Sequence, residues 1–169
     1  MHVKPSKDVT AGLRLQVIRS VLQIPVAEAV SMFRGVTEAA WLAMENGDQP
    51  IPDQITRKLD TLFSWRNHQL AMTRQLIANN PTCHLSEFWH RSMDDWMAID
   101  EREPEHFRVT QSLVAALATE YPAQYKVFPF DLAAFTTWAG GRHATEELQA
   151  QYLGEVTEPV SSRPPTDRP

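Results

Sequence analysis

The sequence predicts an all-α protein built in two parts. Apolar residues recur three and four positions apart over most of its length, as at Leu15, Ile18 and Leu22. Proline and glycine interrupt this pattern at intervals that leave room for several short helices. The hydrophobic fraction of 43% is ordinary, so most of the 169 residues should fold around a core.

The first part, residues 1–80, is expected to form a helical bundle after a short polar arm. Pro25 cannot continue a helical hydrogen-bond ladder, so the first helix ends before it. Gly47 suits the end of a helix, and Pro52 suits the first position of the next one. The expected helices cover about residues 10–22, 26–33, 37–46 and 52–80, the last either as one long helix or as two placed end to end.

The second part, residues 81–153, is also expected to be mainly helical, with one short extended segment as its candidate strand. Ser92 can cap a helix, and Pro104 can start another. The expected elements are an extended segment over residues 84–89 and helices over residues 93–100, 104–120, 131–139 and 145–153. Residues 154–169 are polar and rich in proline, which predicts a disordered tail.

The two short helices in the first part are the most informative stretch of the sequence. Gly35, in the tight turn with Arg34, supplies the backbone freedom that a sharp corner needs. Thr37 can cap the second helix, Ala29 lets the helices approach closely, and Trp41 should be buried between them. Such a pair forms the helix-turn-helix unit that reads DNA; the other interpretation is a small helical domain in which two short helices happen to meet.

Charge and composition limit the possible partners and compartments. The net charge of −5 argues against nucleic-acid binding, but residues 1–80 carry nine Lys and Arg against seven Asp and Glu. Only this part could face phosphates, because residues 81–169 carry seven against fourteen. No apolar run is long enough for a membrane span, and no signal peptide is apparent. The single cysteine, Cys83, excludes an intrachain disulfide and fits a cytoplasmic location.

No group of residues points to catalysis, a metal or a cofactor. Cys83, His84 and His90 would need a fourth ligand with fitting spacing to hold zinc, and the sequence offers none. Asp94 and Asp95 are adjacent, so on a helix they diverge by about 100° and cannot act as one carboxylate pair. Because no nucleophile–base pair is apparent either, we do not expect an enzyme.

Two separated blocks of residues resemble a known family. They are Leu15, Gln16, Ile18, Arg19, Leu22, Val26, Glu28, Ala29, Val36, Trp41, Glu45 and Gly47 in the first part, and Asp94, Trp96 and residues 111–117 in the second. The family is a small bacterial and phage helix-turn-helix family that includes the anti-CRISPR-associated repressors, within the wider lambda-repressor-like (XRE) group. The resemblance is fairly specific because both blocks occur in the right order. It covers about residues 13–121, and residues 122–169 extend beyond the family pattern.

This resemblance implies a homodimeric, sequence-specific transcriptional repressor of its own gene, bound to an inverted repeat of double-stranded DNA. The implied DNA-binding residues are Arg34, Thr37, Glu38, Ala39, Leu42 and Asn46. Arg34 and Thr37 would meet phosphate at the start of the reading helix. The next three would face the bases, and Asn46 would hold the DNA backbone beyond the far end.

The base-facing positions depart from the pattern of the wider group, which usually carries Gln, Arg, Ser or Asn there. Here they are Glu38, Ala39, Leu42 and Ala43. Glutamate can accept from cytosine N4 and alanine can contact a thymine methyl, but no bidentate donor for guanine or adenine is present. The alternative function is therefore a protein–protein interaction module on the same scaffold that no longer binds DNA.

The helix expected over residues 104–120 also suggests how two copies would associate. It carries apolar residues on one side and alanines on another, which is more apolar surface than one monomer should bury. We therefore expect this helix and the aromatic pair before it to form the dimer interface. The predicted interface residues are Phe88, Trp89, Phe107, Val114 and Leu117.

Overall fold

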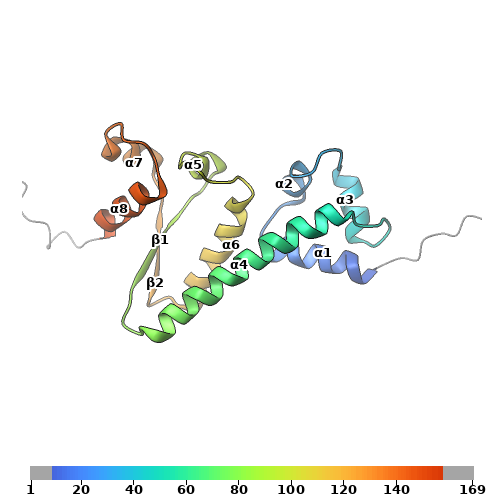
Figure 1. Cartoon of the computed structure of the whole chain (residues 1–169), viewed down its shortest axis with the longest axis horizontal. Helices are drawn as coiled ribbons and strands as arrows, with labels where there is room; N and C mark the ends of the chain where they lie inside the picture. Colours follow the sequence, from blue (N-terminus) through green and yellow to red (C-terminus); the bar gives the residue numbers. More distant parts are fainter. Residues whose placement is uncertain (1–8, 158–169) are drawn as a thin grey trace, which may run out of the picture.

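The computed structural model describes residues 9–157, which form a mainly helical protein with a small sheet (Figure 1). The helices are α1 (Val9–Val21), α2 (Val26–Ser31), α3 (Glu38–Glu45), α4 (Asp53–Asn79), α5 (Met93–Met97), α6 (His106–Glu120), α7 (Leu132–Ala139) and α8 (Glu146–Thr157), and the strands are β1 (Leu85–Trp89) and β2 (Tyr125–Pro129). The mainly α class is confirmed. The polar arm at residues 1–8 and most of the predicted tail, residues 158–169, lie outside the described residues; residues 154–157 are helical.

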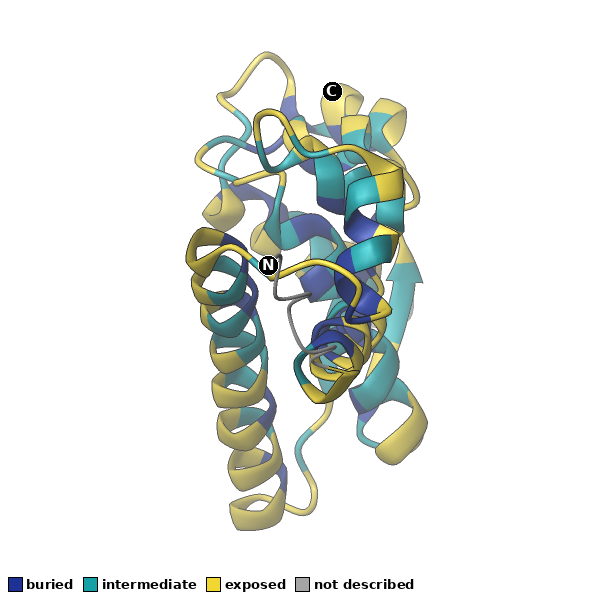
Figure 2. Ribbon diagram, turned by 90° about the vertical axis from the view of Figure 1, so that its right-hand side faces the viewer, coloured by how far each residue is buried: buried dark blue, intermediate teal, exposed yellow. Residues whose placement is uncertain are grey.

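The first four helices share one core, as expected from their apolar stripes. Trp41 is fully buried, which confirms its predicted place between the short helices. The core consists of Leu15, Ile18, Leu22, Ile24, Ala29, Trp41, Met44, Ile55, Leu59, Leu62 and, from α6, Val109. Figure 2 shows such buried residues on the inward faces of the helices and exposed residues on the outer faces.

Glycine at position 12 lets α1 lie directly on the end of α3. A Cβ added there would stand 2.6 Å from the Met44 carbonyl oxygen and closer still to that of Glu45. Real Cβ atoms do not approach backbone oxygens so closely. Any side chain at Gly12 therefore has to push the two helices apart.

A buried ion pair reinforces the same contact between α1 and α3. Glu45, only 7% exposed, accepts hydrogen bonds from Trp41 Nε1 at 2.7 Å and Arg19 Nε at 2.6 Å. The Arg19 guanidinium also donates to the Ile24 carbonyl oxygen at 2.9 Å. The Arg19 side chain turns inward because the buried carboxylate needs a charged partner.

One continuous helix, α4, joins the two parts of the molecule (Figure 1). Its 27 residues span about 40 Å, which decides between the two alternatives that the apolar pattern left open. Ile55 and Leu59 pack in the first core, whereas Leu70 packs with Val114 and Leu117 of α6. α4 therefore contributes side chains to two buried clusters, and it ends next to the boundary expected at residue 80.

The second strand was not predicted from the sequence. β1 and β2 run parallel in register, with Leu85 opposite Tyr125 and Trp89 opposite Pro129. Only β1 had been recognised, as the extended segment at residues 84–89. The segment forming β2 is five residues long and ends in proline, so its own residues give little sign of a strand. It is stabilised by a partner 40 residues away, reached through the crossover that contains α6.

Four of the five predicted dimer-interface residues lie inside the monomer. Phe88, Phe107, Val114 and Leu117 are 4% exposed or less, and Trp89 is half-buried. The helix does carry apolar residues around much of its surface, but the chain covers them itself with α4, the sheet and the first core. These four side chains are therefore covered by their own chain in this structure, and the surface on which a second copy docks stays a prediction.

The last two helices pack against the sheet through aromatic residues. The centroid of the Phe88 ring of β1 lies 5.7 Å from that of Tyr152 in α8 and 5.3 Å from that of Phe130, which follows β2. The ring centroid of Phe135 in α7 lies 5.5 Å from that of Phe130 on the same side. Asp131 caps α7 by accepting from the Ala134 amide, and Gly140 ends it in the left-handed conformation, φ 61°. No helix within residues 9–157 is long and apolar enough to cross a membrane.

Candidate nucleic-acid interface

The pair α2 and α3 presents one face to solvent while its other face is anchored in the core. Gly35 lies between the helices with a φ of 80°, in the region that favours glycine, as the tight turn requires. Thr37 caps α3, and its hydroxyl oxygen accepts from the Ala40 amide at 3.2 Å. Ala29 of α2 and Trp41 of α3 are fully buried in the first core and anchor the pair there.

All six residues predicted to contact DNA are exposed: Arg34, Thr37, Glu38, Ala39, Leu42 and Asn46. Arg34 lies in the turn, and Thr37 and Glu38 lie together at the start of α3. Leu42, four residues beyond Glu38, lies on the same side of the helix and is 48% exposed. Asn46 forms the C-cap, so it lies at the opposite end of α3, about 12 Å away along the axis.

The start of α3 has mixed electrostatics. The positive end of a helix dipole favours an anion such as phosphate, and the Thr37 hydroxyl can still donate its hydrogen while its oxygen caps the helix. Glu38 places a carboxylate in the same first turn, which opposes an approaching phosphate. The exposed Arg34 in the preceding turn supplies the nearest positive charge.

Several cations of the first part are already held by carboxylates. Arg14 pairs with Asp60 at 2.7 Å, and Arg19 is committed to buried Glu45. Lys58 pairs with Glu105. Within residues 9–80, the exposed Arg34 and Arg57 form no ion pair with any described residue. The face around α3 is therefore only weakly positive.

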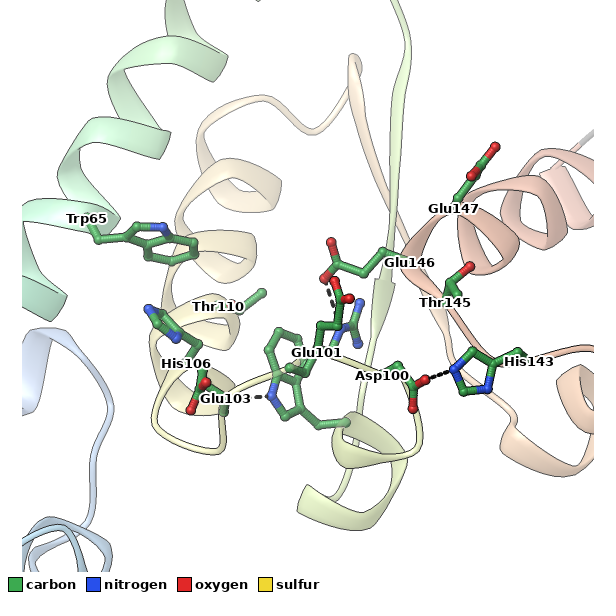
Figure 3. A pocket seen from close by; sticks show the side chains of 12 residues that line it. Trp65, Asp100, Glu101, Glu103, His106, Thr110, His143, Thr145, Glu146 and Glu147 are labelled. Atoms are coloured by element: carbon green, nitrogen blue, oxygen red, sulfur yellow. Dashed lines mark hydrogen bonds and ion pairs between the residues drawn. The ribbon is translucent and has the colours of Figure 1, made fainter.

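A cleft between α4, α6 and α8 has the wrong charge for DNA (Figure 3). Its volume is about 580 Å³. It is lined by Trp65, Trp96, Asp100, Glu101, Arg102, Glu103, His106, Thr110, His143, Thr145, Glu146 and Glu147. Arg102 lies 4.0 Å above the Trp96 ring and pairs with Glu146, while His143 pairs with Asp100. Five carboxylates in one cleft repel phosphate, so a nucleic-acid surface is not to be sought here.

Buried polar residues around α6 were not identified as functional from the sequence. Gln111 Nε2 donates to the His90 carbonyl oxygen at 2.9 Å, and the buried Ser112 hydroxyl accepts from Arg66 Nε at 2.7 Å. Arg108 reaches Glu28 of α2. The signal available was the polar Gln–Ser pair directly before the apolar run at residues 113–118, since buried polar groups are usually paired.

His90, a rejected zinc ligand, is held as a neutral acceptor. Its Nε2 accepts from Arg102 Nη1 at 3.0 Å and Gln149 Nε2 at 2.8 Å. Burial and the nearby Arg102 charge lower the pKa of His90 to about 4, against the opposing Asp95 charge. The described residues contain no group of three or more His, Cys, Asp or Glu side chains placed to hold a metal ion.

The mainly helical fold with its exposed helix pair agrees with a class of small helical regulators. The family described as Aca2/YdiL-like matches residues 10–125, and the chain belongs to this family. It is similar to the Aca2 repressor of Pectobacterium phage ZF40, at 26% identity over 110 residues, which covers 63% of this chain and 90% of that protein. The resemblance to anti-CRISPR-associated repressors is thus confirmed, and α7 and α8 lie beyond the matched region.

Proposed function

We propose that this chain is a sequence-specific DNA-binding repressor in the cytoplasm, and that it acts as a homodimer on an inverted repeat beside its own gene. The observation that carries the proposal is the exposed outer face of α3, held rigidly by a buried Trp41 and the Arg19–Glu45 pair, in a chain similar to a named repressor. α2 and α3 would form the helix-turn-helix unit, with α3 in the major groove.

Within this proposal, each reading residue has a distinct task. Arg34 and the Thr37 hydroxyl contact phosphates at the start of α3, and Asn46 contacts the DNA backbone beyond its end. Glu38 accepts from a cytosine amino group, while Ala39 and Leu42 contact thymine methyl groups. Recognition then rests on few base contacts and on the shape of the DNA.

The second candidate is a protein–protein interaction module on a helix-turn-helix scaffold. The absence of guanidinium or amide side chains at Glu38, Ala39 and Leu42 favours it, because the common bidentate base contacts are then missing. A half-exposed leucine at the centre of the same face also suits a protein partner. Neither function needs a catalytic residue or a cofactor.

Two steps separate the two candidate functions. Duplexes that the protein binds are first selected from a random pool, and the selected duplex and a scrambled duplex are then titrated at low salt. A repressor binds the selected duplex more tightly than the scrambled one, and the selected duplex contains an inverted repeat. Arg34→Glu abolishes this binding and Ala39→Arg strengthens it, because each changes the charge of the surface that faces the negatively charged DNA. Arg91→Glu, the same charge change at an exposed site in the second part, is the matched control and leaves binding nearly unchanged. Equal and very weak binding to every duplex supports the interaction module instead.

The homodimer is tested separately by sedimentation across the micromolar range. A symmetric dimer places its two reading helices about 34 Å apart so that both enter successive major grooves. A species of 19.2 kDa at all concentrations contradicts the dimer.

A further inference from the structure

Helix α6 contacts both parts of the molecule. Near its start, Val109 is fully buried in the core that also holds Trp41. One and two turns later, Val114 and Leu117 pack with Leu70 of α4 and Tyr125 of β2. α6 is therefore the element through which the α2–α3 pair can be held at a fixed orientation to the sheet.

A bidentate ion pair joins α6 to α2. Arg108 Nη2 donates to Glu28 Oε1 at 2.6 Å and Arg108 Nε to Glu28 Oε2 at 2.9 Å, across 80 residues of sequence. Both side chains are about two-thirds buried. A planar guanidinium bound to both carboxylate oxygens restricts the orientation as well as the distance of its partner, which a lysine ammonium does not.

The ion pair is the outer end of a series of hydrogen bonds that runs through residues of the second part of the molecule. Arg108 Nη1 donates to Gln111 Oε1 at 2.9 Å, and Gln111 Nε2 donates to the His90 carbonyl oxygen at 2.9 Å. The His90 ring then accepts from Gln149 of α8. Gln111, His90 and Gln149 are all at least nine-tenths buried, so these bonds are shielded from water. This series of hydrogen bonds thus links α2 to α8, a helix beyond the region matched by the family.

We propose that Arg108 is a positioning residue that fixes the α2–α3 reading unit to α6 and the sheet, and thereby sets the separation of the two reading helices in the dimer. This inference rests on the proposed DNA-binding function. Arg108 lies outside the exposed face of α3 and acts on DNA only through Glu28. Its loss leaves each reading unit folded around Trp41 and in contact with Val109, but removes the ion pair that restrains the orientation of α2.

The first test is hydrogen exchange in the free full-length protein. In Arg108→Ala, the hydrogen-bonded amides of residues 29–33 exchange faster than in the wild type, because the ion pair that joins α2 to α6 is lost. Arg74→Ala is the matched control: its 2.7 Å pair with Glu120 joins α4 to α6 and does not involve α2, so exchange in α2 stays unchanged. The double variant Glu28→Arg/Arg108→Glu restores slow exchange, whereas Arg108→Lys restores it only in part. Unchanged exchange of α2 in Arg108→Ala overturns the inference.

The second test compares a selected duplex carrying two half-sites with one carrying a single half-site. Arg108→Ala loses about 5-fold or more in affinity on the two-site duplex and clearly less on the single site. A residue that merely stabilised α2 would weaken binding to both equally, and equal losses contradict the positioning role. If the wild-type chain binds no duplex, the proposed function fails and the role in spacing with it. Hydrogen exchange then still decides whether Arg108 holds α2.

Discussion

At the scale of single residues, one glycine controls how closely α1 and α3 approach. We predict that Gly12→Ala lowers the free energy of unfolding by about 1–3 kcal/mol, because the new methyl group collides with backbone oxygens of residues 44 and 45. Gly154 in α8 is the matched control, since nothing lies within 4 Å of a Cβ added there. Gly154→Ala should stabilise the protein by about 0.5–1 kcal/mol. Urea unfolding of both variants measures the difference, and equal effects would contradict the close approach.

His90 makes stability depend on pH in a predictable direction. The pKa of His90 is about 4 in the folded chain, against the ordinary value of 6.5 that applies to the unfolded chain. Between these two pH values the unfolded chain therefore binds a proton that the folded chain does not. Stability therefore falls as the pH drops from 6.5 towards 4, and we predict that His90 contributes about 1–2 kcal/mol of this loss between pH 7 and pH 5.

The variant His90→Gln isolates this contribution, because glutamine keeps an acceptor for Arg102 and Gln149 but does not titrate. Urea midpoints of the wild type and of His90→Gln, measured at several pH values, should converge as the pH falls. His68→Gln, at an exposed histidine of α4, is the control and should retain the wild-type fall. Parallel pH profiles for the wild type and His90→Gln would show that His90 has the same pKa in the folded and unfolded chains, which contradicts the prediction.

At the scale of elements, α6 is a core helix whose apolar faces are covered by its own chain. Leu117 is 1% exposed and packs with Leu70, Val114 and Tyr125. We predict that Leu117→Ala lowers the free energy of unfolding by about 2–5 kcal/mol without changing the molecular weight in sedimentation. Leu76→Ala, at a leucine of α4 that is 46% exposed, should have almost no effect. A variant that remained stable but dissociated into monomers would restore the original interface assignment.

The elements differ in how far local sequence could predict them. The first three helices were located correctly, with α2 ending two residues earlier than expected, because proline, glycine and capping residues mark their ends. β2 could not be located, since five residues with a terminal proline form a strand only when β1 lies beside them. The inward turn of Arg19 was missed for a similar reason: its partner, Glu45, lies on another helix.

At the scale of the whole molecule, the charge distribution determines how DNA binding responds to salt. Few cations near α3 are without a carboxylate partner, so few counterions would be released. With about three or four phosphate contacts per dimer, we predict a slope of log K against log salt of about −3 to −4. Ala39→Lys should steepen this slope by about 2 per dimer, one for each half-site. Anisotropy titrations over a range of salt concentrations measure both, and a slope steeper than about −7 would mean that other cations face the DNA.

The sequence by itself determined the helical class, the paired short helices, and the family to which residues 10–125 belong. These features depend on spacing, caps and motifs within short stretches of chain. Only the tertiary structure decided which apolar side chains are buried within the monomer and which charged side chains are paired there. Phe107 and Leu117 are buried because other elements of the same chain pack over α6. Arg108 forms its ion pair because the fold brings Glu28 of α2 next to α6. Burial and ion pairing depend on partners tens of residues away, and no local pattern specifies these partners.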